Sequence, residues 1–225
     1  LYLIFWKCDN MPCKGCHNPD TWAKTEGEMK SAEEILQQAL RYKRYWGKKG
    51  GITVSGGEAL LQIDFVTELF TLAKEKGVNT CLDTAGNPFT REEPFYSKFE
   101  KLMEVTDLFM LDIKEIDEDE HKQLTGQTNK NILDMATCLS DHGKAMWIRH
   151  VLVPGITDDD GQLHRLRAFI DTLKTVERVE ILPYHTLGVF KWKELGIPYA
   201  LEEVEPPTKE QVEHAREIII PGYKS

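Results

Sequence analysis

The sequence has 225 residues, of which 41% are hydrophobic and 29% charged, as in a globular chain long enough for one large domain or two small ones. Its 28 Lys and Arg residues stand against 37 Asp and Glu residues, and the net charge of -9 argues against a general nucleic-acid-binding surface. No apolar run approaches the roughly 18 to 20 residues that cross a bilayer, and residues 1–6 are too short for the core of a secretion signal. We therefore expect a cytoplasmic protein that binds neither membrane nor nucleic acid.

Short apolar runs alternate with amphipathic stretches along the whole chain. The runs are typical of strands covered on both faces, and the amphipathic stretches of helices with one apolar side. The expected strands lie at residues 1–6, 52–55, 78–83, 108–113, 145–153 and 176–183. The expected helices lie at residues 31–46, 63–76, 90–104, 131–142, 163–173 and 208–219. The first of these helices begins at a capping box, Ser31-Ala-Glu-Glu34.

This alternation predicts an α/β fold in which repeated βαβ units build a parallel sheet. An open doubly wound sheet and a partial TIM-like (β/α)6 barrel, with parallel strands and outer helices, both fit the pattern. The polar residues favour the barrel, because they follow strand ends, and barrels carry their chemistry at the C-terminal ends of their strands. The sequence shows no internal repeat and no linker, so we expect a single domain over residues 1–225.

Three cysteines crowd together just after the first expected strand. Cys8, Cys13 and Cys16 supply soft thiolate ligands for three irons of a cubane cluster, and the remaining iron would be open to a substrate. A zinc site with His17 as fourth ligand is the alternative, because zinc also accepts three Cys and one His. The spacing alone does not separate the two. Cys81 and Cys138 are too few for a second cluster.

Further polar residues follow the later strands. Ser55-Gly-Gly-Glu58 is a turn in which absent side chains let the backbone approach a ligand, although such turns are more often structural. Asp83-Thr84 and Met110-Leu-Asp112 offer oxygens to a hard cation, unless Asp83 only closes a turn. Arg149 lies inside an apolar strand and must find an anion or an acidic partner. A lone His such as His185 is more often a packed polar side chain than a ligand.

The strings that carry these features are CKGCHNPDTW (13–22), TVSGGEA (53–59), TCLDT (80–84), MLDIK (110–114), WIR (147–149), VPG (153–155) and LPYH (182–185). Together they resemble the pyruvate formate-lyase activating enzymes, within the radical S-adenosylmethionine family of glycyl-radical-enzyme activases. The resemblance extends from the first strand to about residue 219. One departure is in the cysteine loop. The family spacing, Cys-x3-Cys-x2-Cys, would place the first thiol at Asp9, whereas this chain has it at Cys8.

The resemblance implies an iron-sulfur site with a bound cosubstrate. It makes Cys8, Cys13 and Cys16 the ligands of a catalytic 4Fe-4S cluster whose open iron chelates S-adenosylmethionine. It makes Gly56, Gly57 and Glu58 the turn that holds the methionine amine, and it counts Glu58 among the catalytic residues.

The resemblance also implies a cation beside the methionine carboxylate. This monovalent cation, Na+ or K+, would be bound by Asp83, Thr84, the carbonyl of Met110, and Asp112. Asp112, Lys114 and His185 would contact the nucleoside end of S-adenosylmethionine, and Arg149 would also bind this cofactor.

The implied function is that of an oxidoreductase. The activase would cleave S-adenosylmethionine reductively to a 5'-deoxyadenosyl radical, which abstracts hydrogen from a glycine Cα on a loop of pyruvate formate-lyase during anaerobic glucose fermentation. A flavodoxin or ferredoxin would donate the electron, and we expect a monomer. The family also carries a short N-terminal segment before the first strand, which this sequence lacks. The alternative is a non-enzymatic iron-sulfur or zinc-binding electron-transfer module.

Overall fold

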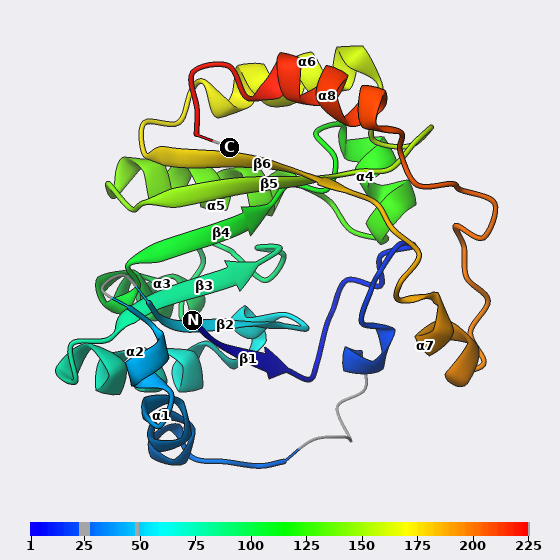
Figure 1. Ribbon diagram of the computed structural model, residues 1–225. Coiled ribbons are helices and arrows are strands. Elements are labelled where there is room, and N and C mark those ends of the chain that lie inside the picture. Colours follow the sequence, from blue (N-terminus) through cyan, green and yellow to red (C-terminus); the bar gives the residue numbers. More distant parts are fainter. Residues whose placement is uncertain (23–27, 48–49, 225) are drawn as a thin grey trace.

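The computed structural model describes residues 1–22, 28–47 and 50–224, and within them six parallel strands form one curved sheet. The strands lie side by side in the order of the sequence (Figure 1). They are β1 (Tyr2–Trp6), β2 (Gly51–Gly56), β3 (Asn79–Thr84), β4 (Leu108–Asp112), β5 (Met146–Leu152) and β6 (Val176–Pro183). In the described residues β1 and β6 are the two edges of the sheet and do not pair with each other. The predicted partial barrel is therefore confirmed.

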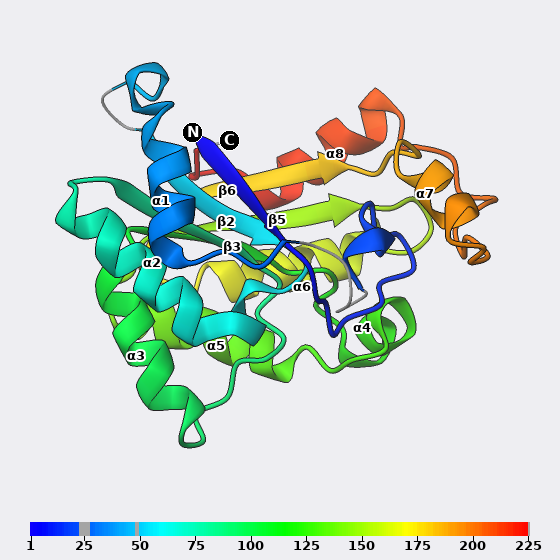
Figure 2. The same ribbon diagram turned by 90° about the horizontal axis from the view of Figure 1, so that it is seen from below.

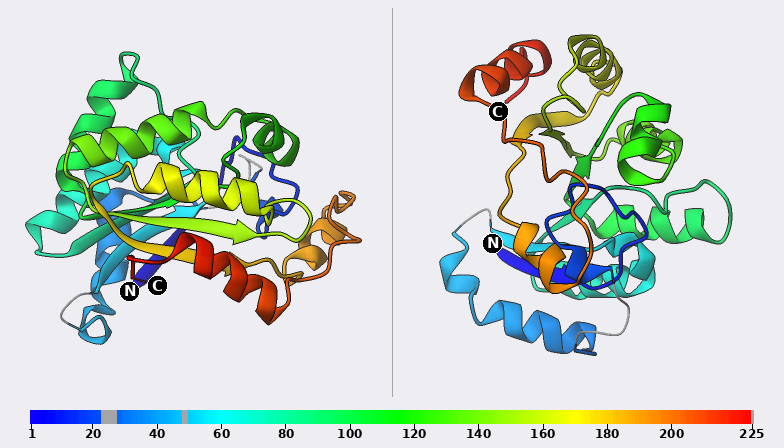
Figure 3. Two further views of the ribbon diagram at one scale, coloured as in Figure 1. Left: turned by 90° about the horizontal axis from the view of Figure 1, so that it is seen from above. Right: turned by 90° about the vertical axis from the view of Figure 1, so that its right-hand side faces the viewer.

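Helices cover the outer face of the curved sheet, and Figure 3 shows them outside the arc that the strands form. The helices in the described residues are α1 (Ala32–Leu40), α2 (Ile63–Glu75), α3 (Phe95–Val105), α4 (Glu118–Thr125), α5 (Lys130–Asp141), α6 (Asp160–Ile170), α7 (Val189–Glu194) and α8 (Lys209–Ile219), and all but α4 and α7 lie on this outer face. Helix α2 contacts both α1 and α3 (Figure 2), and α6 contacts α8. None of the helices in the described part of the chain is long and apolar enough to span a membrane.

Side chains along the strands alternate between the helix-covered core and the interior of the open barrel. In β5, Met146, Ile148, His150 and Leu152 are buried, whereas Trp147, Arg149 and Val151 between them are only partly buried. The same period of two leaves Asp83 of β3 and Asp112 of β4 partly buried on the interior side. Strand pairing places Asp112 directly opposite Arg149. The interior therefore collects charged side chains from neighbouring strands.

The structure adds two helices that the sequence pattern did not predict, α4 and α7. Both lie beyond the strand tips, beside the loop that follows β1 (Figure 1). The segment before α4 contains a buried Glu115 whose Oε1 accepts hydrogen bonds from the Ile116 and Asp117 N–H groups. The Asp117 side chain then caps the N-terminus of α4.

Candidate functional site

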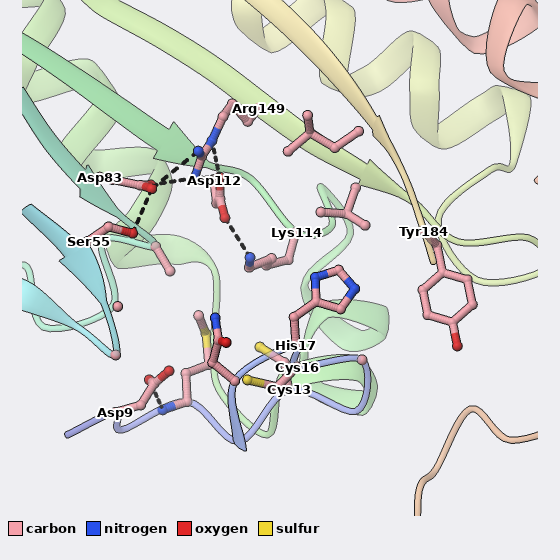
Figure 4. A pocket seen from close by; sticks show the side chains of 18 of the residues that line it. Asp9, Cys13, Cys16, His17, Ser55, Asp83, Asp112, Lys114, Arg149 and Tyr184 are labelled. Carbon is pink, nitrogen blue, oxygen red and sulfur yellow. Dashed lines mark hydrogen bonds and ion pairs between the residues drawn. The ribbon is translucent and has the colours of Figure 1, made fainter. Parts of the chain in front are cut away.

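A cavity of about 510 Å³ opens at the C-terminal ends of the strands. Every strand or the residues directly after it contribute to the wall, which includes Phe5, Ser55, Asp83, Asp112, Arg149 and Leu182. Cys13, Cys16 and Lys114 close the cavity from the loops, and Figure 4 shows these polar groups gathered around one space. Polar residues from the ends of separate strands thus meet at one mouth, as the barrel prediction requires.

Arg149 joins two carboxylates from neighbouring strands. Its Nε lies 2.7 Å from Asp112 Oδ1, and its Nη1 lies 3.3 Å from Asp83 Oδ2, while Nη2 donates to Asp83 Oδ1. Lys114 Nζ lies 2.7 Å from Asp112 Oδ2, and Ser55 Oγ donates to Asp83 Oδ2 at 2.8 Å. The interior arginine has therefore found the acidic partners that its position in an apolar strand requires.

The two carboxylates of this network experience different surroundings. Burial raises the pKa of both, but the charges of Lys114 and Arg149 outweigh burial at Asp112 and hold its pKa below the ordinary value. At Asp83 burial and the neighbouring Asp112 charge prevail over Arg149, so its pKa is raised. Burial lowers the pKa of Lys114, but the Asp112 charge more than compensates, and Lys114 remains a cation. The site therefore keeps fixed charges of both signs around the cavity.

Two thiols of the cysteine loop face the cavity, those of Cys13 and Cys16. The loop is tied to both added helices, because Lys14 N–H donates to Leu124 O at 3.0 Å and Trp192 Nε1 donates to Cys16 O at 2.8 Å. Burial raises the pKa of Cys13 to about 12 and also raises that of Cys16. Among the described residues, no three His, Cys, Asp or Glu side chains are grouped closely enough to hold a single metal ion.

The first cysteine of the loop is placed differently. The cavity wall includes Asp9, Cys13 and Cys16, but within the described residues it does not include Cys8. Cys8 has a positive φ of 97°, while the Asp9 Oδ1 accepts a hydrogen bond of 2.9 Å from Met11 N–H. Sequence reasoning named Asp9 only as a departure from the family spacing. Asp9 lies beyond the end of β1 at Trp6, so the alternation of strand side chains gives no signal for it.

The two histidines considered in the sequence lie against each other at the rim. The rings of His17 and His185 stack with centroids 4.0 Å apart, and His17 Nε2 lies 3.1 Å from the His185 carbonyl oxygen. Burial, followed by the nearby His185, lowers the pKa of His17. Both rings line the cavity. His17, which directly follows Cys16, thus stacks on a ring from the β6 side of the cavity.

The glycine turn after β2 lies under the cysteine loop. A side chain on Gly57 would bring its Cβ within 2.1 Å of the Cys8 carbonyl oxygen, and Gly56 has a φ of 115° that favours glycine. Both glycines line the cavity, but the adjoining Glu58 is only 3% exposed. The positive φ at Gly56 and the close backbone approach at Gly57 therefore favour glycine at both positions, whatever ligand they contact.

The Glu58 carboxylate binds protein groups of the β2 and β3 ends. Its Oε1 accepts from Leu60 N–H at 2.9 Å and from Thr84 Oγ1 at 2.6 Å, and its Oε2 accepts from Ala85 N–H at 3.1 Å. Burial raises the pKa of Glu58 to about 7 despite these donors. Thr84 lines the cavity, whereas the wall within the described residues does not include Met110, which pairs with Asp83 across the sheet. The cofactor roles expected for Glu58 and Met110 stay predictions.

The fold and this site define a radical S-adenosylmethionine protein. The model of the radical SAM superfamily matches residues 4–166, which is more than half of the chain, so the chain belongs to that superfamily. Within it, the chain belongs with the pyruvate formate-lyase-activating enzymes. It is 54% identical to the enzyme of that name from Streptococcus mutans over 220 residues, covering 97% of this chain and 84% of the relative. It is 48% identical to that of Listeria monocytogenes over 219 residues, covering 97% and 88%.

Solved structures of more distant relatives share the fold. A domain of a pyruvate-formate lyase-activating enzyme from Bacteroides vulgatus superposes with a TM-score of 0.63 at 21% identity, covering 78% of this chain and 96% of the domain. SuiB of Streptococcus suis, bound to its precursor peptide SuiA, superposes with a TM-score of 0.69 at 16% identity, covering 97% of this chain and 46% of SuiB. At such identities the likeness concerns the fold alone.

Proposed function

We propose that this chain activates a glycyl-radical enzyme of the pyruvate formate-lyase kind by abstracting hydrogen from a glycine Cα. The observation that carries the proposal is the shared cavity, where the Cys13 and Cys16 thiols face the ion pairs of Asp83, Asp112 and Arg149. The chain that holds this cavity is 54% identical to the pyruvate formate-lyase-activating enzyme of Streptococcus mutans. A function outside radical chemistry would leave both the thiols and this identity unexplained.

The side chains around the cavity fit a 4Fe-4S cluster with S-adenosylmethionine beside it. Cys13 and Cys16 offer soft donors to iron, and the Lys114 charge acts on both thiols, so it would favour their ionised, iron-binding form. When bound and reduced, the cluster supplies the electron that splits S-adenosylmethionine into methionine and a 5'-deoxyadenosyl radical.

The remaining residues bind and orient the cosubstrate. We propose that Asp112, Lys114 and His185, which line the cavity, contact the nucleoside end, and that Arg149 holds a carboxylate through its planar guanidinium. The bare backbone of Gly56 and Gly57 leaves room for the methionine amine. Leu124, Val151, Val153 and Leu182 form apolar parts of the wall and would keep water from a reactive radical.

The same proposal includes a monovalent cation, Na+ or K+. Asp83 and Asp112 already share a positive partner in Arg149, the Thr84 side chain lines the same wall, and Met110 pairs with Asp83 across the sheet. A cation bound to these carboxylates and to the Met110 carbonyl would release the Arg149 guanidinium toward the carboxylate of S-adenosylmethionine.

The macromolecular side of the proposal follows from the open barrel. The edges β1 and β6 do not pair in the described residues, so an extended glycine-bearing loop of pyruvate formate-lyase could approach the cavity from the side of the sheet. Glycine suits such a reaction because it has no side chain to obstruct its Cα. We further propose a flavodoxin or ferredoxin as electron donor, a monomeric state, and action in the cytoplasm.

The proposal is tested by anaerobic reconstitution with iron and sulfide, reduction by dithionite, and measurement of 5'-deoxyadenosine. We expect a brown protein that releases 5'-deoxyadenosine and methionine in equal amounts. Cys16→Ser should abolish cleavage, whereas Cys138→Ser, at a buried thiol of α5, should retain it. A cluster-loaded protein that leaves S-adenosylmethionine intact would instead support the electron-transfer module, and a colourless zinc-loaded protein would support the zinc site.

A further inference from the structure

We propose that the indole N–H of Trp22 is a hydrogen-bond donor to the Cys16 sulfur and thereby raises the reduction potential of the cluster that Cys16 would hold. The inference rests on the proposed function, because it concerns the cluster which that function requires. The observation behind it is a buried donor beside the cysteine loop. Trp22 Nε1 is buried and, within the described residues, makes no hydrogen bond of ordinary geometry.

Trp192 of α7 places the Trp22 side chain beside Cys16. The indole Nε1 of Trp192 donates to the Cys16 carbonyl oxygen at 2.8 Å. The same ring packs edge-on against the ring of Trp22, with centroids 5.2 Å apart and an angle of 87° between the planes. Trp192 itself is buried. Because one buried ring contacts both the backbone of Cys16 and the side chain of Trp22, the two residues are held as neighbours.

The chain that leads to Trp22 is a fixed turn. Thr21 N–H donates to Asn18 O at 2.9 Å, and Trp22 N–H donates to Pro19 O at 3.2 Å. Lys191 of α7 binds the turn from outside, because its Nζ lies 2.8 Å from Asn18 Oδ1. The indole of Trp22 is thus fixed through its backbone as well as through its ring.

The free indole donor acts on the sulfur of Cys16. Burial raises the pKa of this thiol, whereas the Asn18 backbone N–H and the Trp22 indole N–H both lower it. A donor that lowers the pKa of a thiol favours negative charge on its sulfur. A metal keeps a coordinating thiol ionised, and hydrogen bonds to an ionised acceptor are shorter and stronger than those to a neutral one. We therefore expect the loose contact between Nε1 and the sulfur to become a hydrogen bond in the loaded protein.

Such a hydrogen bond affects reduction in a defined direction. Reduction adds one electron to the cluster and increases the negative charge on its sulfur atoms. An N–H that faces one of these sulfurs stabilises the reduced form more than the oxidised form, and hydrogen bonds to sulfur are among the factors that set the potential of such clusters. Trp22 is therefore a positioning residue that acts through Cys16.

The test is a redox titration of anaerobically reconstituted protein, in which electron paramagnetic resonance measures the reduced cluster. Trp22→Phe removes the N–H but keeps an aromatic ring against Trp192. We expect the ratio of reduced to oxidised cluster at a given potential to fall about tenfold, which is a shift of about 59 mV to more negative values for one electron.

Trp46→Phe is the matched control for this titration. Trp46 Nε1 is likewise buried and without a hydrogen-bond partner in the described part of the chain, but Trp46 belongs to the helix-covered core. The substitution removes the same kind of donor at a distance from the cysteine loop. It should leave the potential of the cluster unchanged.

A third protein separates the donor from the packing of the ring. β-(3-benzothienyl)alanine at position 22 keeps the shape of the indole and has sulfur in place of the N–H, so it should bind iron even where the smaller ring of Trp22→Phe does not. Its potential should also become more negative. An unchanged potential in this protein would overturn the inference, and so would an equal shift in Trp46→Phe. Cleavage of S-adenosylmethionine by wild type, measured alongside with dithionite, would show in either case that the proposed function stands, whereas a wild type without any cluster would contradict both.

Discussion

Asp112 carries two charge-assisted contacts at once, because one oxygen accepts from Arg149 and the other from Lys114, each at 2.7 Å. Asp112→Asn would remove the charge that keeps both cations in place. We expect the affinity for S-adenosylmethionine to fall about ten- to a hundredfold, since one such contact contributes about 1.5 to 3 kcal/mol. The measurement is a titration of the reduced, cluster-loaded protein.

The control for Asp112 is Asp64→Asn, which breaks an ion pair with Lys98 on the surface of α2. That exposed pair should contribute little, so its loss should leave the affinity unchanged. Both variants should also keep the wild-type iron content. An unchanged affinity in Asp112→Asn would return this carboxylate to a structural role.

Glu58 makes the stability of the fold depend on pH. Its pKa of about 7 in the folded protein lies above the ordinary 4.5, so the folded state binds more protons than the unfolded state between these values. The stabilisation is present below about pH 4.5 and is lost as the pH rises toward 7. This one group should lower the free energy of unfolding by about 1.4 kcal/mol for each pH unit in that window.

Urea unfolding of anaerobic protein between pH 5 and 7 measures this contribution. Glu58→Gln cannot titrate, so the decrease of its stability with pH should be smaller than that of wild type by this amount. Glu202→Gln, at an exposed position, should retain the wild-type slope. Equal slopes in wild type and Glu58→Gln would show that the buried carboxylate stays ionised, held by its three hydrogen-bond donors.

The sequence predicted the partners of individual cavity residues where strand position and charge determine those partners. Arg149 needed acidic partners because its strand is apolar, and it pairs with Asp83 and Asp112. The ligand role of Cys8 stays a prediction. The backbone of Cys8 is held by Thr21 and Glu58, and no local sequence pattern contains these tertiary contacts.

Single helix ends contribute measurably to the folded state. In α1 the Ser31 side chain accepts from Glu34 N–H at 3.2 Å, and the Glu34 carboxylate accepts from Ser31 N–H at 2.8 Å, which is the predicted capping box. Ser31→Ala should lower the free energy of unfolding by about 0.5 to 2 kcal/mol, measured by urea unfolding. Thr71→Ala, inside α2 with its hydroxyl bonded to the carbonyl one turn earlier, should change it by less than about 0.5 kcal/mol. Equal losses in the two variants would mean that the cap has no special role.

Whole elements were predictable where their apolar period was clear. Helix α2 was predicted because Val66, Leu69 and Phe70 form its buried side. Helix α4 has the sequence EDEHKQLT, whose few apolar residues leave no clear period, and α7 has only six residues. The expected helix at residues 31–46 ends at Leu40, and a short 3-10 turn then leads to Trp46, which is buried.

In the whole molecule, the residues that form the core and the residues proposed for the chemistry lie on opposite faces of the curved sheet. The core lies between the strands and the outer helices, whereas the charged residues lie in the open interior. Helices α4 and α7 hold the cysteine loop over the strand tips through contacts to Lys14 and Cys16. The order of the elements could be predicted from alternation alone. The position of α4 and α7 at the mouth of the barrel could not be predicted, because the sequences of these two helices show no clear apolar period.

The central claim, that this chain makes a glycyl radical on a partner enzyme, is tested most directly by electron paramagnetic resonance. The cluster-loaded chain, S-adenosylmethionine and a one-electron donor are incubated anaerobically with pyruvate formate-lyase, or with a peptide that spans its reactive glycine. We expect the signal of a glycyl radical, and a weaker reaction or none when that glycine is replaced by alanine, whose methyl group obstructs the Cα. Continued cleavage of S-adenosylmethionine with no radical on either substrate would contradict the claim.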